Sequence, residues 1–484
     1  MLTTLRASPR AAPRVDRPYL WLAALAGAAL LVHGYHIGVE DAAIYLPAIK
    51  YHLDPSLYPH DLALVTAQAR FTLFDELVAG LAGATRLPLD LLLIVLHLVV
   101  TFGILVGCWR IAAHCFPDRL PRWSAVLLVA VLSPLPVAGT LLHVDENYLH
   151  PRRVAAAALL LAFASLLERR RRAAALWTSL AVVVHPQMAA YGLFHFAVQF
   201  WPASTPRPSG AIAAVVPLDG WTRVLTERRH LVPFRWNAIE WTGVLFPLLA
   251  FARIVHTANR VGATVAAHIA WRLALAIGLA VAAALALPLL PTPALLLDPM
   301  RALHFAYLLV ILLGGGLLGQ VHLRRRPLTL LALAIVLAAA ALTTARLTFS
   351  SSGQIEPSAH LSSNAYVQAF EWVREHTPTD ALFALDPDYL RQPGADAHGF
   401  RALAERSMLA DRAKDRAVVL YAPSLADRVE REIDVRSNWK AFQREDFLRL
   451  GQSQAVDWIL IDASQRPDLV CPYENTRVRV CRLN

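Results

Sequence analysis

Long runs of predominantly apolar residues limit what this chain can fold into more than any other feature. Four of them cover residues 18–37, 89–107, 263–290 and 327–347. As a helix, each run is long enough, or nearly so, to cross a hydrocarbon layer about 30 Å thick. Charged residues make up only 17% of the chain, whereas soluble proteins contain about 25%. We therefore expect an integral membrane protein that crosses the bilayer many times.

The net charge of +10 is carried by short arginine-rich segments between the apolar runs. These segments contain Arg6, Arg10, Arg14 and Arg17, then residues 169–172, then residues 324–326. Lysine and arginine resist translocation, so short basic loops mark the cytoplasmic side of a membrane protein. Binding to nucleic acid would require a basic face interleaved with aromatic residues on a folded domain. The sequence contains no such pattern, and we expect no nucleic-acid partner.

One topology follows when the basic segments are placed in the cytoplasm. The N-terminus is then cytoplasmic, and the run from Pro18 is a retained first helix because no small-residue cleavage site follows it. This helix leads to a long outer loop, residues 38–88. Residues 1–349 are expected to form a transmembrane bundle of about nine to eleven crossings. Further helices are expected near residues 89–112, 123–142, 242–256, 264–290, 303–320 and 327–347.

The C-terminal residues 350–484 differ in character and predict a soluble α/β domain on the outer side. Apolar patterns predict helices at 365–376 and 400–411, and strands at 381–385, 417–421, 458–462 and 478–483. Strands that alternate with helices are typical of a small α/β domain. Cys471 and Cys481 flank a short polar stretch and would form a disulfide if this domain lies outside the cytoplasm.

Glu40 and Asp41 are the first candidates for chemistry. They follow the first helix directly, in the segment Gly-Val-Glu-Asp-Ala-Ala-Ile-Tyr at residues 38–45. Two carboxylates at a membrane surface would bind a divalent cation such as Mg²⁺ or Mn²⁺, or one of them would act as a general base. The alternative is a solvated helix end without a function.

The second predicted outer loop carries an unusual density of titratable groups. Its candidate binding residues are Asp145, Glu146, His150, Arg152 and Arg153. Arginines on the outer side depart from the usual charge bias, and the planar guanidinium is well suited to phosphate. The loop is therefore expected to hold an anion, with Asp145 and Glu146 as further metal candidates. The alternative is a water-exposed loop of mixed charge.

Three further candidates lie in or beside apolar segments. His185 precedes Pro186 within the block 173–201, where proline breaks a helix; the sequence leaves open one broken crossing or two short helices. Ionisable groups in membrane helices usually face a cavity or a partner, although a histidine satisfied by a neighbouring carbonyl fits equally well. Arg301 and His304 lie where a later helix begins, and Arg301 would meet a lipid phosphate or extend to the headgroups.

Taken together, these features resemble the GT-C type of membrane glycosyltransferase. The resemblance rests on a first helix, a long outer loop that opens with Glu40-Asp41, a second acidic outer loop with Asp145-Glu146, and an outer C-terminal domain. The stretches at residues 38–47, 184–187, 298–301, 377–388 and 399–407 resemble more closely an uncharacterised bacterial membrane family of that plan.

The resemblance implies an inverting transferase that uses a polyprenyl-phosphate-linked sugar as donor. The acceptor would be a glycan, lipid or protein outside the cytoplasm, and the chain would lie in the bacterial inner membrane. An acid of the first loop, Asp41 or Glu40, would be the base. Arg152, Arg153 and Arg301 would hold the phosphate.

Two other function classes are alternatives to a transferase. A non-catalytic protein on the same scaffold would bind polyprenyl lipid or organise envelope assembly. A transporter would need polar residues at mid-membrane on several helices, and these are sparse here.

Overall fold

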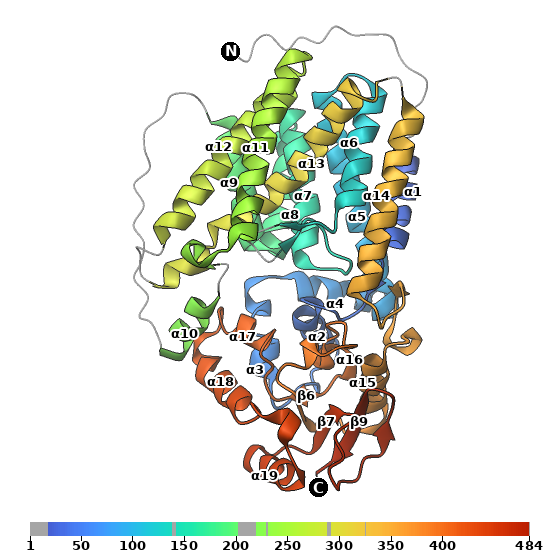
Figure 1. Cartoon of the computed structure of the whole chain (residues 1–484), viewed down its shortest axis with the longest axis vertical. Helices are drawn as coiled ribbons and strands as arrows, with labels where there is room; N and C mark the ends of the chain where they lie inside the picture. Colours follow the sequence, from blue (N-terminus) through green and yellow to red (C-terminus); the bar gives the residue numbers. More distant parts are fainter. Residues whose placement is uncertain are drawn as a thin grey trace.

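The computed structural model describes residues 18–137, 142–201, 219–228, 231–287, 292–324 and 326–483. The chain is mainly helical with a small sheet region. One group of long helices fills the upper part of Figure 1, and the sheet lies with shorter helices in the lower part. The basic residues predicted to mark the cytoplasmic N-terminus lie outside the described residues.

The upper group is a bundle of apolar helices. Its members are α1 (Pro18–His33), α5 (Leu89–Cys115), α6 (Arg119–Leu132), α7 (Pro151–Leu167), α8 (Arg171–Val184), α9 (Pro186–Phe200), α11 (Ala238–Arg260), α12 (Thr264–Ala286), α13 (Ala302–Val321) and α14 (Pro327–Thr348). Five helical segments of the described chain are long and apolar enough to cross a membrane: Leu89–Cys115, Ala238–Arg260, Thr264–Ala286, Leu295–Val321 and Pro327–Thr348. This finding indicates a membrane protein, and nine to eleven crossings remain a prediction.

Two uncertain parts of the sequence interpretation are resolved by prolines. The block 173–201 forms two helices, α8 and α9, that meet at His185-Pro186. The helix expected at 123–142 was placed wrongly, because α6 begins at Arg119 and ends at Leu132. Prolines lack the N–H that a continuing helix needs, and Pro134 and Pro136 follow α6 directly. The chain forms instead the short antiparallel pair β2 (Pro136–Val137) and β3 (Leu142–His143).

The first predicted outer loop is folded into helices between the bundle and the C-terminal region. These are α2 (Ala42–Leu53), α3 (Leu62–Val65) and α4 (Phe74–Thr85). A further short helix, α10 (Asp219–Glu227), lies at the left edge of Figure 1 beside α18. The loop therefore forms a layer that connects the two parts of the molecule.

The C-terminal region contains a five-stranded sheet of order β6-β5-β7-β9-β8. Strand β5 pairs in parallel with β6 and β7, whereas β9 pairs antiparallel with β7 and β8. The strands are β5 (Leu382–Leu385), β6 (Ser407–Met408), β7 (Trp458–Asp462), β8 (Tyr473–Glu474) and β9 (Val478–Arg482). The helices are α15 (Ala365–His376), α16 (Phe400–Ala404), α17 (Asp415–Val418), α18 (Ala426–Asp434) and α19 (Arg444–Gln454). Outside this sheet, β1 (Tyr35–His36) pairs in parallel with β4 (Ile355–Glu356).

Two elements of this region were predicted wrongly. The helix expected at 400–411 ends at Ala404, because Glu405 adopts a left-handed conformation with φ +54° and the chain turns into β6. The strand expected at 417–421 is replaced by the short helix α17 and a turn. The side chain of Asp411 accepts hydrogen bonds from the backbone N–H groups of Ala413 and Lys414, and such local bonds favour a turn over a strand.

A buried ion cluster joins the first loop to the C-terminal region. We call Asp61, Arg401, Asp411 and Asp415 the Arg401 cluster. The Arg401 guanidinium donates to Asp61, to both carboxylate oxygens of Asp415 at 3.0 Å, and to the carbonyl of Met408. The cluster therefore holds the first loop against the C-terminal region.

The two cysteines near the C-terminus are close enough to bond. Cys471 and Cys481 form a disulfide that connects the segment before β8 to strand β9. The bond was expected only for a domain outside the cytoplasm. The cysteines of α5, Cys108 and Cys115, are free and buried.

Candidate active-site cavity between the bundle and the C-terminal region

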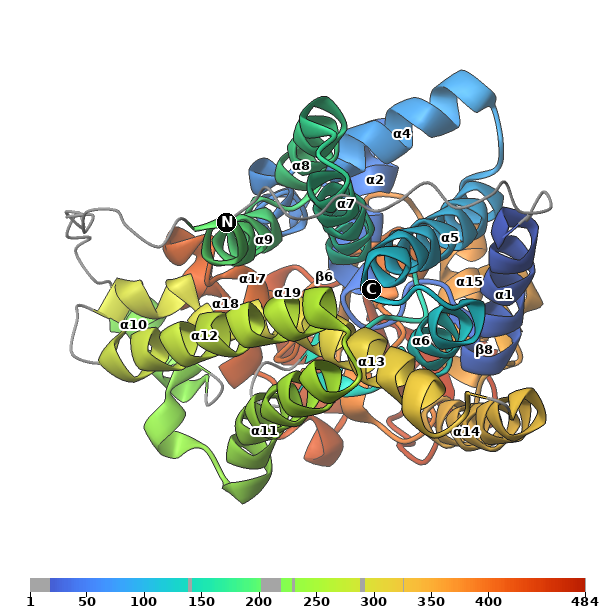
Figure 2. The same cartoon turned by 90° about the horizontal axis from the view of Figure 1, so that it is seen from above.

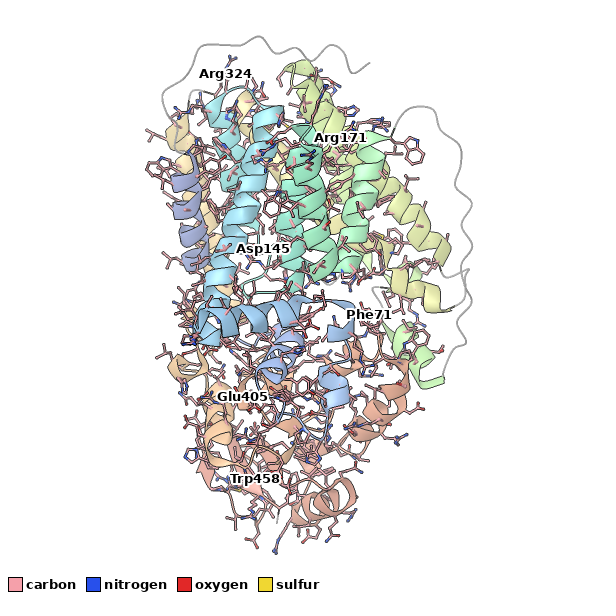
Figure 3. The ribbon with its side chains drawn as sticks, turned by 180° about the vertical axis from the view of Figure 1, so that it is seen from behind. Phe71, Asp145, Arg171, Arg324, Glu405 and Trp458 are labelled. Carbon is pink, nitrogen blue, oxygen red and sulfur yellow. A yellow bond between two sulfur atoms is a disulfide. The ribbon has the colours of Figure 1, made fainter. Side chains whose placement is uncertain are left out.

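A cavity of about 950 Å³ lies between the helix bundle and the C-terminal region. Nine of the ten residues predicted from the sequence line it: Glu40, Asp41, Asp145, Glu146, His150, Arg152, Arg153, His185 and Arg301. His304 is the exception; it is buried and bonds the backbone of residues 143 and 144. Figure 3 shows Asp145 at the end of the bundle that faces the C-terminal region. Segments more than a hundred residues apart thus meet around one space.

The first acidic pair is held by close contact with the C-terminal region. Gly38 has φ +71°, and a Cβ there would lie 2.9 Å from the side chain of Leu403. Gly399 donates its N–H to the carbonyl of Gly38 at 2.9 Å. Glu40 also adopts a left-handed conformation, with φ +49°. Non-glycine residues in this region are strained and cluster at functional sites, which suggests a function for the turn at Glu40.

Asp41 is the centre of the charged network in the cavity. Its Oδ1 accepts a hydrogen bond from Lys414 Nζ at 2.9 Å, and its Oδ2 accepts one from Arg152 Nη2 at 3.3 Å. The side chain is 34% exposed, so a ligand in the cavity can reach it. Burial raises the pKa of the Asp41 carboxyl, but the charges of Lys414 and Arg152 outweigh burial and hold the pKa well below its usual value.

The second acidic loop supplies the partner of Arg152. Glu146 accepts a hydrogen bond from Arg152 Nη2, the same nitrogen that reaches Asp41. Three buried atoms here have no hydrogen-bond partner in the described part of the chain: Glu146 Oε2, His150 Nε2 and Arg152 Nε. Buried polar groups are nearly always satisfied. Three unsatisfied groups in one cavity therefore indicate a bound ligand or ordered water.

Two histidine-proline pairs position the cavity's imidazole rings. His150 and His185 are the N-cap residues of α7 and α9, and Pro151 and Pro186 occupy the first helical positions. The Nδ1 atom of His150 accepts from the N–H of Arg152 at 3.0 Å. In the neutral ring the proton then lies on Nε2, which is 3.7 Å from Asp41 Oδ2. The cap therefore directs an N–H of His150 toward Asp41.

Arg153 and Asp145 form a neighbouring network of their own. Arg153 donates to both oxygens of Asp145, to His97 and to the hydroxyl of Thr101 at 2.8 Å. Three side chains and the carbonyl of Tyr148 thus engage the guanidinium, and two of these side chains belong to α5. Asp145 and Arg153 therefore fix the second loop to the bundle. Because these contacts occupy the Arg153 guanidinium, we expect other cations to contact a phosphate.

The three metal candidates do not form a prepared cation site. Asp41, Asp145 and Glu146 each contact a lysine or arginine. In the part of the chain that the structure describes, two other groups have metal-ligand spacing: His52 with Asp75 and Glu76, and His360 with Glu371 and Glu375. Carboxylates that are already neutralised by side-chain cations do not fit a divalent ion, and we derive no step through one.

The cavity has an apolar flank as well as a charged centre. Side chains of α1, α6 and α14 form it, among them Leu30, Val129, Leu337 and Ala341. Helix α14 is largely exposed along its apolar span, with only 11% of that span buried. In a bilayer such a surface faces lipid, so the flank offers a route for a hydrocarbon chain from the membrane to Asp41.

Several cavity residues were missed by the sequence analysis because they come from distant segments. Lys414 lies in the turn before α17 and contacts both Glu40 and Asp41 at 2.9 Å. Arg228 follows α10, and Tyr421 follows α17; both line the same cavity. Lys414 lies among the alternating charges of residues 411–416, and nothing in that local pattern indicates that it contacts the first acidic pair. The two His-Pro pairs were a usable signal, because both mark helix starts.

Comparisons with known proteins add no family to this picture. The chain matches no family model, and no curated protein matches it. The functional argument therefore rests on the geometry of the cavity.

Proposed function

We propose that this chain is a membrane glycosyltransferase that moves a sugar from a polyprenyl-phosphate donor to an acceptor outside the cytoplasm. The observation that carries the proposal is the cavity itself. It combines an accessible carboxylate, Asp41, with lysine and arginine groups and a flank of apolar helix surface. A lipid-linked sugar phosphate requires all three features in one place.

The distribution of charge over the molecule supports the proposed orientation. Arg171 and Arg324 lie at the end of the bundle away from the sheet, as Figure 3 shows. Basic residues favour the cytoplasmic side, so the opposite end, with the cavity and the C-terminal region, would lie outside. The disulfide between Cys471 and Cys481 suits an oxidising compartment. We propose the bacterial inner membrane, with a GT-C-like arrangement of bundle and outer domain.

In the proposed reaction, Asp41 takes the proton of an acceptor hydroxyl as the acceptor oxygen attacks the anomeric carbon. The bond between that carbon and the phosphate oxygen breaks, and its electron pair leaves with the polyprenyl phosphate. Attack from the opposite side inverts the anomeric configuration. Arg152 and Lys414 stabilise the charge on the departing phosphate.

The position of Lys414 suggests how Asp41 becomes a base. While Lys414 contacts Asp41, the low pKa of the carboxyl makes it a weak proton acceptor. A donor phosphate competes for the same ammonium group. When Lys414 turns to the phosphate, the pKa of Asp41 rises and proton transfer becomes easier.

The same ion pairs favour a second candidate function. An Asp41 carboxylate held by both Lys414 and Arg152 also fits a non-catalytic protein that binds polyprenyl lipid. Such a protein would keep its lipid affinity without turnover. The two functions differ in whether a bond in the donor is broken.

The decisive experiment measures release of free polyprenyl phosphate, which every such transfer produces. Purified protein in liposomes would receive polyprenyl-phosphate hexoses and a cell-envelope extract as acceptor source. We expect release by the native chain and a loss of about 10²–10⁴-fold in Asp41→Asn, the range for removal of a general base. Asp54→Asn is the matched control, since Asp54 is exposed on the same loop and, among the described residues, its side chain bonds Ser56 alone. Equal release by Asp41→Asn would refute the proposed base.

A further inference from the structure

The cavity ends at a second group of cations, away from its apolar flank. Arg228 and Arg301 line this end together with Tyr421. Arg228 follows α10, whereas the apolar flank includes α14. Figures 1 and 2 both place α10 and α14 on opposite sides of the molecule. The cavity therefore extends from a lipid-facing side to a cationic end.

Arg228 and Arg301 differ from the other cavity cations in the groups that they contact. Arg152, Arg153 and Lys414 all contact carboxylates. Arg228, in contrast, has no hydrogen bond or ion pair from its guanidinium to any described residue. Arg301 uses only its Nε, which donates to Asp298 Oδ2 at 2.8 Å. Four carboxylates and five lysine or arginine side chains line the cavity, and within the described ranges Arg228 is the cation that pairs with no carboxylate.

The surroundings hold Arg228 at the cavity. On α10, the helix that precedes Arg228, Trp221 is buried and donates its Nε1 proton to the carbonyl of Leu420 at 3.2 Å. The neighbouring Glu227 pairs with Arg416 at 2.7 Å. Both contacts tie α10 to the C-terminal region. Arg228 itself is half-buried, and burial together with the charge of Arg416 lowers its pKa.

Tyr421 connects the two arginines. It lines the cavity together with them and interacts electrostatically with both guanidinium groups. Its hydroxyl lies 3.5 Å from Gln187 Oε1. Two guanidinium groups with unused donors beside a hydroxyl match the oxygens of a carboxylate or phosphate. The charge of Asp41 also acts on Arg228, but no described carboxylate forms an ion pair with it, and a bound oxyanion would supply that contact.

We propose that Arg228 and Arg301 bind an anionic group of the substrate that lies farther from the lipid tail than the reacting phosphate. This group is a carboxylate or phosphate on the transferred sugar or on the acceptor. The inference rests on the proposed function for the identity of the bound molecule. The anion site itself follows from the geometry of the cavity.

Binding of three soluble probes to the full chain in detergent at low salt tests the site. The probes are inorganic phosphate, glucuronate and, as the neutral comparison, glucose. We expect both anions to bind more tightly than glucose. Arg228→Gln should weaken anion binding about tenfold or more, the range for a charged hydrogen bond, and Arg228→Lys should restore part of it. Arg431→Gln, an exposed arginine on α18 with the same charge change, should have no effect.

The outcomes separate this inference from the proposed function. Anion binding that is unchanged in Arg228→Gln, or weakened equally by Arg431→Gln, would overturn the inference while leaving the transferase proposal intact. Displacement of inorganic phosphate from Arg228 by polyprenyl phosphate would also overturn it, because the lipid phosphate would then occupy this end. If the native chain binds both anions through Arg228 but releases no polyprenyl phosphate in liposomes, the proposed function fails and the anion site stands.

Discussion

Two buried ion clusters lie close together in this molecule and differ in one physical respect. In the Arg401 cluster, every nitrogen of the guanidinium has a partner, and the adjoining space is about 20 Å³. Around Asp41, Arg152 has an unsatisfied Nε and the adjoining space is about 950 Å³. The same residue types therefore serve structure where the guanidinium is fully bonded and the adjoining space is closed, and are available for chemistry where a guanidinium nitrogen is free beside a large cavity.

The largest expected effect is on stability at the closed cluster. Arg401→Met leaves Asp61 and Asp415 buried without a cation. Removal of one partner of a buried ion pair costs about 3–5 kcal/mol, and we expect the unfolding temperature in detergent to fall accordingly. Arg152→Met should cost less, because it leaves one buried carboxylate, Glu146, without its arginine, whereas Asp41 keeps Lys414 and opens to the cavity. Equal losses in the two variants would remove the distinction between the clusters.

The closed cluster should also make stability depend on pH. Burial and the charge of Asp415 raise the pKa of Asp411 to about 7. Between about pH 4 and pH 7 the folded chain holds a proton that the unfolded chain has lost, so stability falls as pH rises, by up to about 1.4 kcal/mol per unit. Unfolding temperatures at pH 5, 6, 7 and 8 measure this slope.

Asp411→Asn should flatten the slope between pH 6 and pH 7, above the pKa of about 6 to which burial raises Asp75, and raise the unfolding temperature above pH 7. Asp41→Asn is the control, because the pKa of Asp41 lies below the tested range. A slope that persists in Asp411→Asn would show that another group titrates.

At the open cluster, Lys414 should affect catalysis more than stability. Lys414→Met removes a charge that lowers the pKa of Asp41 and, in our proposal, stabilises the departing phosphate. We expect release of polyprenyl phosphate to fall about tenfold, the value of one charged contact. The pH below which activity is lost should move upward, because Asp41 then takes up a proton more readily. A downward move would contradict the proposed interaction.

Glu40 should show the smallest effect. Its side chain is 51% exposed, and its ion pair with Lys414 is solvated. Exposed pairs contribute about 0–1 kcal/mol, so Glu40→Gln should change the rate by less than about fivefold. A loss as large as that of Asp41→Asn would make Glu40 the base.

The sequence allowed prediction of the features that depend on local chemistry. Apart from α6, apolar runs predicted the long helices to within a few residues, and the strands at 382–385, 458–462 and 478–482 followed from their apolar patterns. The two acidic loops were identified because charges beside apolar helices are conspicuous. The proximity of Asp41 to the second loop was a hypothesis that only the tertiary structure could examine.

Features that depend on distant contacts could not be predicted. The helix predicted at 400–411 ends early because Ser407 and Met408 pair with β5 in a sheet whose other strands come from distant parts of the chain. Lys414 carries no local signal, since its role depends on the turn that Asp411 forms. Arg228 directly follows a short helix, α10, whose position depends on its contacts with the C-terminal region.

A structure of the full chain with bound polyprenyl phosphate tests the central claim most directly. We predict the hydrocarbon chain between α1, α6 and α14, with the phosphate within hydrogen-bond distance of Arg152 or Lys414. A phosphate at the opposite end of the bundle, beside Arg171 or Arg324, would contradict the claim that the cavity around Asp41 is the active site.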